Sequence, residues 1–187
     1  MDAFLTSVLA VTLAEIGDKT QLLSLVLITR FRQPWPIIAG IFVATIANHA
    51  LAGLLGAQVG AWLGPALLRW IVGLGFLAMA AWTLIPDKLD EDEKAPTRGA
   101  FVTALIAFFL AEMGDKTQLA TIGLAAAHPG HALGVIMGTT VGMMLAIVPV
   151  VLLGDRIAER VKMSSVRFVA SALFAVFGAY VLWRGVG

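Results

Sequence analysis

Apolar residues fill most of this chain in long stretches, and short polar segments separate them. A helix of roughly 20 apolar residues crosses the ~30 Å hydrocarbon layer of a bilayer, so each stretch predicts a membrane-spanning helix. The predicted spans are residues 3–28, 36–57, 67–85, 99–126, 132–153 and 168–183. The composition agrees, with 59% hydrophobic and only 13% charged residues. We therefore expect an all-α membrane protein with six transmembrane helices.

The chain contains an internal repeat. Residues 14–22 recur as residues 111–119, shifted by 97 positions, and only Ile16 differs from its counterpart, Met113. Matches continue outside this motif at a shift of 98. They pair Gly40, Val43, Leu54, Leu55, Gly56, Arg69, Phe76 and Leu84 with Gly138, Val141, Leu152, Leu153, Gly154, Arg167, Phe174 and Leu182.

The repeat predicts how the chain is divided. Residues 1–187 form a single transmembrane domain, with repeat one at 1–85, a hydrophilic linker at 86–98 and repeat two at 99–187. Each repeat holds three spans, and an odd number makes the second repeat enter the membrane from the opposite side. We therefore expect two inverted three-helix repeats, an architecture common among secondary transporters.

Basic residues predict the orientation. Most of them lie in the connections between spans one and two, three and four, and five and six: Arg30, Arg32, Lys88, Lys94, Arg98, Arg156, Arg160, Lys162 and Arg167. The opposite side carries only Arg69 and Arg184. The positive-inside rule places the basic side in the cytoplasm. Both termini and the connections between spans two and three and spans four and five are then non-cytoplasmic, in what we expect to be a bacterial inner membrane.

The repeated motif places charges inside apolar spans, which is costly and marks a functional site. Its carboxylates are Glu15 and Asp18 in the first copy and Glu112 and Asp115 in the second. A spacing of three residues puts both on one face of a continuous helix. Alternatively, the glycine between them permits an unwound turn whose carbonyls can coordinate a cation. In either case we expect the four carboxylates to meet near the membrane midplane.

The charges of this group indicate what it can bind. Four carboxylates together with Lys19 and Lys116 leave two negative charges, which one divalent cation or two protons neutralise. A site that binds a cation and protons in alternation is the basis of antiport. Oxygen ligands suit Ca²⁺, Mn²⁺ or Mg²⁺. The chain has no cysteine and only three histidines, so Zn²⁺ and Cu⁺ are poorly served.

The paired Glu-x-Gly-Asp-Lys-Thr motifs on three-plus-three helices resemble the family of Golgi, chloroplast and bacterial cation/proton exchangers that move Mn²⁺ and Ca²⁺, whose short bacterial members are manganese exporters. The resemblance implies that the four motif carboxylates are cation and proton ligands. It gives supporting roles to Thr20, Gln21, Thr117 and Gln118. The family tends to have an asparagine in the fifth span before Val-Pro, where this chain has Ile147. Asn48 in the other half is the candidate replacement.

Structural roles compete with these assignments. The carboxylates could form ion pairs that only hold helices together, and Lys19 and Lys116 could be counter-ions or take part in proton coupling. Asn48 could be an interhelical hydrogen bonder, and polar side chains commonly serve this purpose in membranes. His49 could relay protons or pack between helices.

The leading hypothesis is a secondary transporter that exports Mn²⁺, with Ca²⁺ as a second ion, in exchange for protons. The main alternative is a passive divalent-cation channel with the same acidic site. An intramembrane enzyme is disfavoured because the sequence lacks a His-Glu-x-x-His motif and a Gly-x-Ser-x-Gly motif. A non-transporting assembly subunit is a fourth hypothesis. The expected partners are divalent cations, protons and lipid, with no resident cofactor and no nucleic acid, and the oligomeric state is left open.

Overall fold

The computed structural model describes residues 3–85, 99–154 and 163–186, and these residues form helices and connecting turns without any strand. The predicted linker 86–98 and most of the basic connection after the fifth span, residues 155–162, lie outside the described residues. The described helices are α1 (Ala3–Glu15), α2 (Lys19–Phe31), α3 (Pro34–Trp62), α4 (Pro65–Thr83), α5 (Gly99–Glu112), α6 (Lys116–Ala127), α7 (Ala132–Leu153) and α9 (Met163–Arg184).

Four of these helices are long and apolar enough to cross a membrane: α3, α4, α7 and α9 from Ser164. The predicted spans 3–28 and 99–126 are each divided into two shorter helices, α1 with α2 and α5 with α6. Large apolar side chains on the outer surface are widely exposed, including Trp35, Leu54 and Trp183. A surface of this kind suits contact with lipid rather than water.

Two predicted boundaries were wrong. Helix α3 continues past residue 57 to Trp62, because a single glycine at position 60 does not stop a helix whose end is set by Pro65. Helix α9 begins at Met163, so residues 163–167, which lie between the predicted fifth and sixth spans, are already helical. Polar residues can extend a membrane helix beyond its apolar part because the helical backbone satisfies its own hydrogen bonds.

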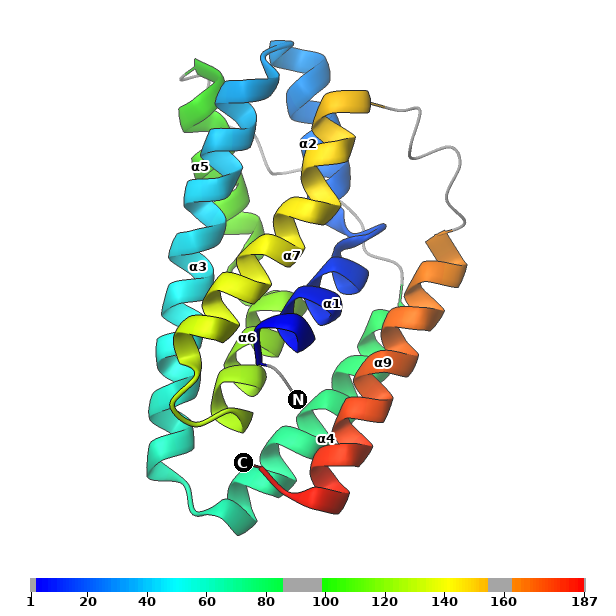
Figure 1. The fold of residues 1–187 in the computed structure, drawn as a ribbon. Helices are drawn as coiled ribbons and strands as arrows, with labels where there is room; N and C mark the ends of the chain where they lie inside the picture. Colours follow the sequence, from blue (N-terminus) through cyan, green and yellow to red (C-terminus); the bar gives the residue numbers. More distant parts are fainter. Residues whose placement is uncertain (1–2, 86–98, 155–162, 187) are drawn as a thin grey trace.

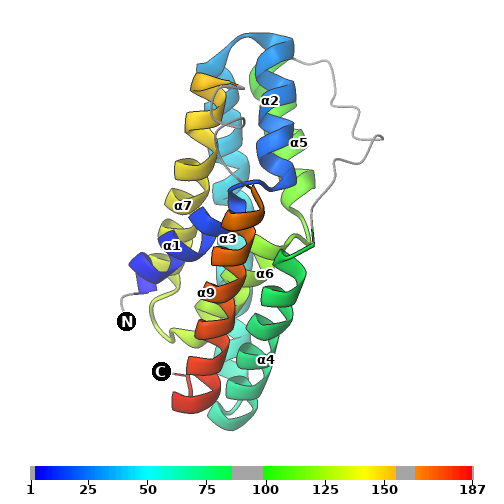
Figure 2. The ribbon, with the colours of Figure 1, turned by 90° about the vertical axis from the view of Figure 1, so that its right-hand side faces the viewer.

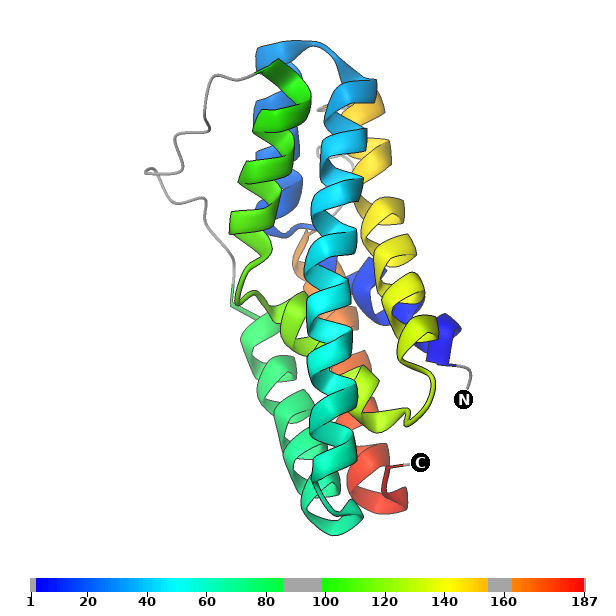
Figure 3. The same cartoon turned by 90° about the vertical axis from the view of Figure 1, so that its left-hand side faces the viewer.

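Several helix ends gather at the two ends of the long axis of the molecule, whereas the end of α4 and the start of α9 lie about midway along it (Figure 1). The turn between α2 and α3, the start of α5 and the end of α7 lie at the top. The turns from α3 to α4 and from α6 to α7, and both chain ends, lie in the lower part. Figure 3 shows the same separation from another side, with α5, α3 and α7 side by side.

Helices α3 and α7 form the centre of the molecule and pack against each other. Helix α5 lies on α3, and α1 lies on α7. Both contacts depend on a glycine: a Cβ atom at Gly40 would lie 2.5 Å from the carbonyl oxygen of Phe101, and one at Gly138 would lie 2.5 Å from that of Phe4. Small residues at such crossings let helix backbones approach closely. The two contacts join equivalent positions of the sequence repeat.

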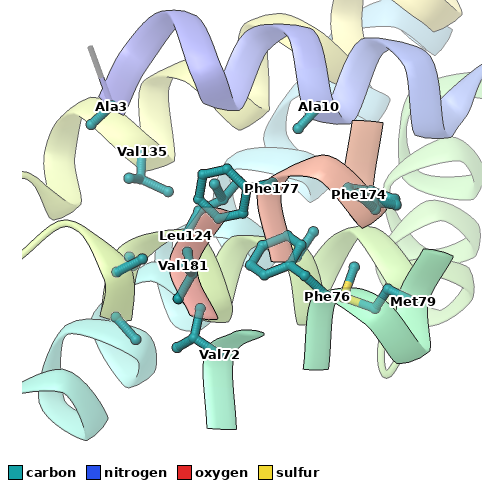
Figure 4. Close-up of a cluster of buried hydrophobic side chains, with 14 of the residues drawn as sticks. Ala3, Ala10, Val72, Phe76, Met79, Leu124, Val135, Phe174, Phe177 and Val181 are labelled. Carbon is teal, nitrogen blue, oxygen red and sulfur yellow. The ribbon is translucent and has the colours of Figure 1, made fainter. Parts of the chain in front are cut away.

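Two clusters of buried apolar side chains stabilise the two ends of the molecule. The lower cluster joins α4 and α9 to α1, α6 and α7, with Phe76 and Phe174 at its centre (Figure 4). The upper cluster joins α2, α3, α5 and α7 through residues such as Leu27, Ile41 and Phe108, and Val11 of α1 also belongs to it. The breaks between α1 and α2 and between α5 and α6 interrupt the chain between these two apolar regions.

Helices α4 and α9 lie side by side and form a pair in the lower part of the molecule. The two helices contact each other, α4 also contacts α6, and α9 also contacts α1. Figure 2 shows this pair below α2 and α5. The short helices on the two sides of each motif therefore have different neighbours.

Candidate functional site

Each motif lies at a break between two helices. Glu15 is the last residue of α1, and Asp18 is the N-cap residue of α2, with extended backbone angles. Gly17 between them has a φ of 84°, which disfavours any residue with a side chain. The Asp18 N–H donates to the Glu15 carbonyl at 3.1 Å and closes the turn. The predicted unwound turn is confirmed, and the alternative of both carboxylates on one continuous helix is wrong.

The second motif repeats this geometry. Glu112 ends α5, Asp115 caps α6, and Gly114 has a φ of 81°. The Asp115 N–H donates to the Glu112 carbonyl at 3.1 Å. A helix break of this kind frees backbone groups from helical hydrogen bonds and changes the direction of the side chains beside it. Many transporters build their ion sites at such breaks.

The glutamine of each motif holds the break in place. The side-chain oxygen of Gln21 accepts the Gly17 N–H at 2.9 Å, and that of Gln118 accepts the Gly114 N–H at 2.7 Å. An amide N–H at a helix break has lost its helical acceptor and needs another one. Both glutamines therefore support the turn.

The threonine of each motif orients the glutamate. The hydroxyl of Thr20 donates to Glu15 Oε2 at 2.6 Å, and the hydroxyl of Thr117 donates to Glu112 Oε2 at 2.9 Å. In both glutamates the other oxygen, Oε1, has no hydrogen-bond partner among the described residues. Each glutamate thus has one oxygen fixed and one oxygen available.

Glu15, Glu112 and Asp115 form a group that we call the carboxylate triad. One carboxylate oxygen from each lies within 4.8 Å of the others, a separation suited to a shared metal ion. The three residues are 0%, 0% and 4% exposed. Asp115 resembles the glutamates in its contacts, because Oδ1 faces Lys19 while Oδ2 has no hydrogen-bond partner among residues 3–85, 99–154 and 163–186.

Two ion pairs connect the motifs to each other. Lys19 Nζ of the first motif lies 3.3 Å from Asp115 Oδ1 of the second, and Lys116 Nζ of the second lies 2.6 Å from Asp18 Oδ1 of the first. The structure therefore brings all four predicted carboxylates and both lysines together. The four carboxylates are not equivalent, however, because Asp18 pairs with Lys116 and stands outside the triad.

The charge of the triad matches a divalent cation. Three ionised carboxylates carry three negative charges, and the contact with Lys19 offsets one of them. Two negative charges remain on buried groups, where uncompensated charge is strongly unfavourable. Either a divalent cation or protons can supply the compensation, and carboxylate oxygens suit Mn²⁺, Ca²⁺ and Mg²⁺.

Asn48 on α3 belongs to the surroundings of the second motif. Its amide nitrogen donates to the Phe109 carbonyl at 3.1 Å, and its oxygen accepts from Gln118 Nε2 at 3.4 Å. In the first motif, Gln21 Nε2 instead donates to the main-chain carbonyl of Ala146 at 3.0 Å. Asn48 and Ala146 are equivalent in the repeat, so a side chain serves one motif and a carbonyl serves the other.

Sequence reasoning missed two features of this site. It did not foresee that the lysines pair across the two repeats, because a spacing within one motif carries no information about the other. It also missed the carbonyl of Ala146, although Pro149 signalled irregular backbone hydrogen bonding nearby on α7. His49 is fully buried, and no described residue hydrogen bonds to its ring nitrogens.

Comparison with known proteins gives consistent matches. The family model described as "Divalent cation/proton antiporter GDT1" matches residues 3–91 and 100–187. A Vibrio cholerae protein named "Putative manganese exporter" is 54% identical over 174 residues, covering 93% of this chain and 87% of that protein. A GDT1-like protein of Synechocystis is 27% identical over 100% of this chain and 99% of its own length. GDT1-like protein 5 of Arabidopsis thaliana is 30% identical over 95% of this chain and 94% of its own length.

No solved structure gives a significant match to this chain.

Proposed function

This chain belongs to the GDT1 family of divalent cation/proton antiporters, which are transporters and not enzymes, and we propose that it exports Mn²⁺ from the cytosol in exchange for protons. The relative from Vibrio cholerae, with its name of manganese exporter, supports Mn²⁺ as the principal ion and export as the direction. Ca²⁺ is the second candidate, because the same oxygen ligands accept it.

The carboxylate triad is the proposed exchange site, and it is the observation that carries this function. Glu15, Glu112 and Asp115 each offer a buried oxygen with no hydrogen-bond partner among the described residues. A divalent cation binds when these groups are ionised, and protons replace it when they are not. Each occupant has to leave before the other binds, which couples the two fluxes.

The supporting groups have defined tasks in this proposal. Thr20 and Thr117 fix the orientation of the two glutamates, and outer hydrogen bonds of this kind typically contribute 10–100-fold to metal affinity. Gln21 and Gln118 stabilise the two breaks, and Asn48 supports the second. Asp18 and Lys116 form a buried pair that connects the repeats next to the triad.

We further propose six membrane spans arranged as two inverted repeats. The spans are α1 with α2, α3, α4, α5 with α6, α7 and α9. The equivalent contacts of Gly40 with α5 and of Gly138 with α1 support this arrangement. The turn between α2 and α3 and the end of α7 also lie at the opposite end of the molecule from the turns that follow α3 and α6 (Figure 1). The basic top end faces the cytoplasm, and both chain ends face the other side.

The test is Mn²⁺ uptake into proteoliposomes under an imposed pH gradient, with lumenal pH followed at the same time. We expect uphill Mn²⁺ movement driven by the proton gradient, which a passive channel cannot perform. Mn²⁺ flux that only follows its own gradient would establish the channel instead. The assay repeated with Ca²⁺, Mg²⁺ and Zn²⁺ gives the ion preference.

Glu15→Gln and Glu112→Gln test the site. Each substitution removes one of the two charges that a divalent cation compensates, so we expect exchange to fall by more than about 100-fold in both variants. Glu91→Gln, the same substitution in the predicted linker, is the matched control and keeps wild-type exchange. Exchange that survives in both motif variants places the site elsewhere.

A further inference from the structure

The two motif lysines stand in different relations to the carboxylate triad. Lys19 contacts Asp115, a member of the triad, at 3.3 Å. Lys116 contacts Asp18, which lies outside the triad, at 2.6 Å. The two lysines occupy the same position in the two motif copies, but the ion pair of Lys19 is with a carboxylate of the proposed exchange site and that of Lys116 is with the aspartate beside it.

Their exposure differs as well. The side chain of Lys19 is 26% exposed, whereas that of Lys116 is 2% exposed and its partner Asp18 is 0% exposed. The Lys19 side chain is therefore partly exposed, whereas the second pair is enclosed by the protein. The longer contact and the partial exposure leave room for the Lys19 side chain to shift when an ion arrives, while the Lys116 side chain is enclosed by packed neighbours.

A positive charge in contact with a ligand opposes the binding of a second positive charge. Charges a few ångströms apart in a buried setting interact strongly. Lys19 on Asp115 therefore lowers the affinity of the triad for a divalent cation. A transporter needs such a limit, because an ion held too tightly is not released.

We propose that Lys19 sets the affinity of the carboxylate triad for the transported cation, weakening binding through its contact with Asp115 so that the ion can leave. Lys116 makes its ion pair with Asp18 instead, so we expect its effect on the affinity of the triad to be smaller than that of Lys19. This inference rests on the proposed function and deepens it by naming the residue that balances capture against release. Lys19 acts through Asp115 and is a positioning residue rather than an ion ligand.

The first experiment measures Mn²⁺ binding to the purified full chain at fixed pH, comparing wild type with Lys19→Gln. We expect the variant to bind Mn²⁺ about tenfold more tightly, which is within the usual range of coupling between neighbouring sites. In proteoliposomes the same variant has a lower KM for Mn²⁺ and a lower maximal rate, because release becomes slower. A lysine that only stabilises the fold would weaken binding when removed.

The absence of cysteine from the chain permits a sharper test. In Lys19→Cys the introduced thiol is unique, and 2-aminoethyl methanethiosulfonate converts it into a side chain that ends in an ammonium group. We expect Lys19→Cys to bind Mn²⁺ tightly and the aminoethylated form to return to wild-type affinity. Methyl methanethiosulfonate, which adds no charge, leaves the tight binding unchanged.

Two controls separate charge from other effects. Thr29→Cys places the same thiol at an exposed position further along α2, and its aminoethylation leaves Mn²⁺ affinity unchanged. The modified and unmodified forms of Lys19→Cys come from one preparation, so a folding defect is common to both and does not follow the charge. Lys19→Arg keeps the charge and retains affinity close to that of wild type.

The outcomes are distinct. Weaker or unchanged Mn²⁺ binding in Lys19→Gln and Lys19→Cys, with a wild type that binds and exchanges Mn²⁺, overturns this inference and leaves the proposed function intact. A wild type that neither binds nor exchanges Mn²⁺ overturns the proposed function and this inference with it. Tight binding that only the charged reagent reverses supports both.

Discussion

The two motif copies, Glu15–Gln21 and Glu112–Gln118, are alike inside each helix break and unlike in their surroundings. Both have a glycine with positive φ, a threonine bonded to the glutamate and a glutamine bonded to the glycine N–H. The first motif is supported by a main-chain carbonyl of α7, and the second by the side chain of Asn48. One aspartate joins the triad, and the other pairs with a buried lysine.

This difference shows which properties of the site are local. The turn and its hydrogen bonds follow from residues within seven positions of one another, so two segments that differ only at Ile16 and Met113 produce them twice. Burial, ion pairing and membership of the triad depend on helices from other parts of the chain. A site with two equivalent halves in sequence therefore has two unequal halves in space, and substitutions at equivalent positions can measure the inequality.

The largest expected difference between the halves concerns the two lysines. Lys116→Gln removes the ion-pair partner of the buried Asp18, and removing one partner of a buried pair costs about 3–5 kcal/mol of stability. Lys19→Gln is expected to cost less, because its contact with Asp115 is longer and its side chain is partly exposed. Thermal unfolding of both variants in detergent measures the difference.

The double variant Asp18→Asn/Lys116→Gln is the control for this prediction. It removes both charges together and recovers part of the stability that Lys116→Gln loses, because no buried charge is left alone. Equal losses in Lys19→Gln and Lys116→Gln would show that the two pairs are equivalent in the membrane environment, contrary to the structure.

The threonines are expected to behave alike. Thr20→Val and Thr117→Val keep the shape of the side chain and remove the hydroxyl that holds a glutamate oxygen. Each is expected to lower Mn²⁺ affinity by about 10–100-fold, the usual effect of losing a group that orients a metal ligand. Equilibrium binding of Mn²⁺ to the purified variants gives the comparison.

Thr121→Val is the matched control for the threonines. Its hydroxyl is buried as well, but its hydrogen bond goes to the carbonyl of Thr117 in its own helix and not to a carboxylate. We expect Mn²⁺ affinity close to that of wild type. A loss as large as that of Thr117→Val would mean that packing, and not the glutamate contact, explains the effect.

The helix crossings test the equivalence of the two halves away from the site. Gly40→Ala and Gly138→Ala each place a methyl group 2.5 Å from a carbonyl oxygen of a neighbouring helix, so each is expected to cost about 1–3 kcal/mol. Gly75→Ala on α4 meets no atom within 4 Å and serves as the control. Unequal losses at positions 40 and 138, measured by thermal unfolding, would contradict the equivalence of the crossings.

The smallest expected effect concerns the different groups to which the two motif glutamines hydrogen bond. Asn48→Ala removes the side-chain partner of Gln118 and costs about 0.5–1.5 kcal/mol, the usual contribution of a hydrogen bond. Hydrogen exchange should become faster in residues 113–118 and stay unchanged in residues 16–21, whose glutamine bonds to a main-chain carbonyl. Faster exchange in both segments would show that the two breaks are coupled.

Much of this fold could be predicted from the pattern of residues. The long apolar stretches gave α3, α4, α7 and α9 within a few residues, because helix formation in an apolar setting depends on local composition and length. The boundaries at Trp62 and Met163 were less accurate, because helices continue into polar residues at no large cost. The break at each motif was one of two alternatives, and Gly17 and Gly114 decided between them by adopting positive φ.

The sequence by itself determined the chemistry of this protein: two identical sets of carboxylate, lysine, threonine and glutamine inside apolar segments, each with a glycine that permits a helix break. Only the tertiary structure decided how these sets combine. It placed Asp115 in the triad and Asp18 on Lys116, and it left Lys19 partly exposed while it buried Lys116. The two segments carry the same polar residues and differ only at Ile16 and Met113, so these polar residues do not themselves encode such a difference. It arises because α3 and α7 contribute different groups to the two motifs and because the pair of α4 and α9 packs on α6 and α1.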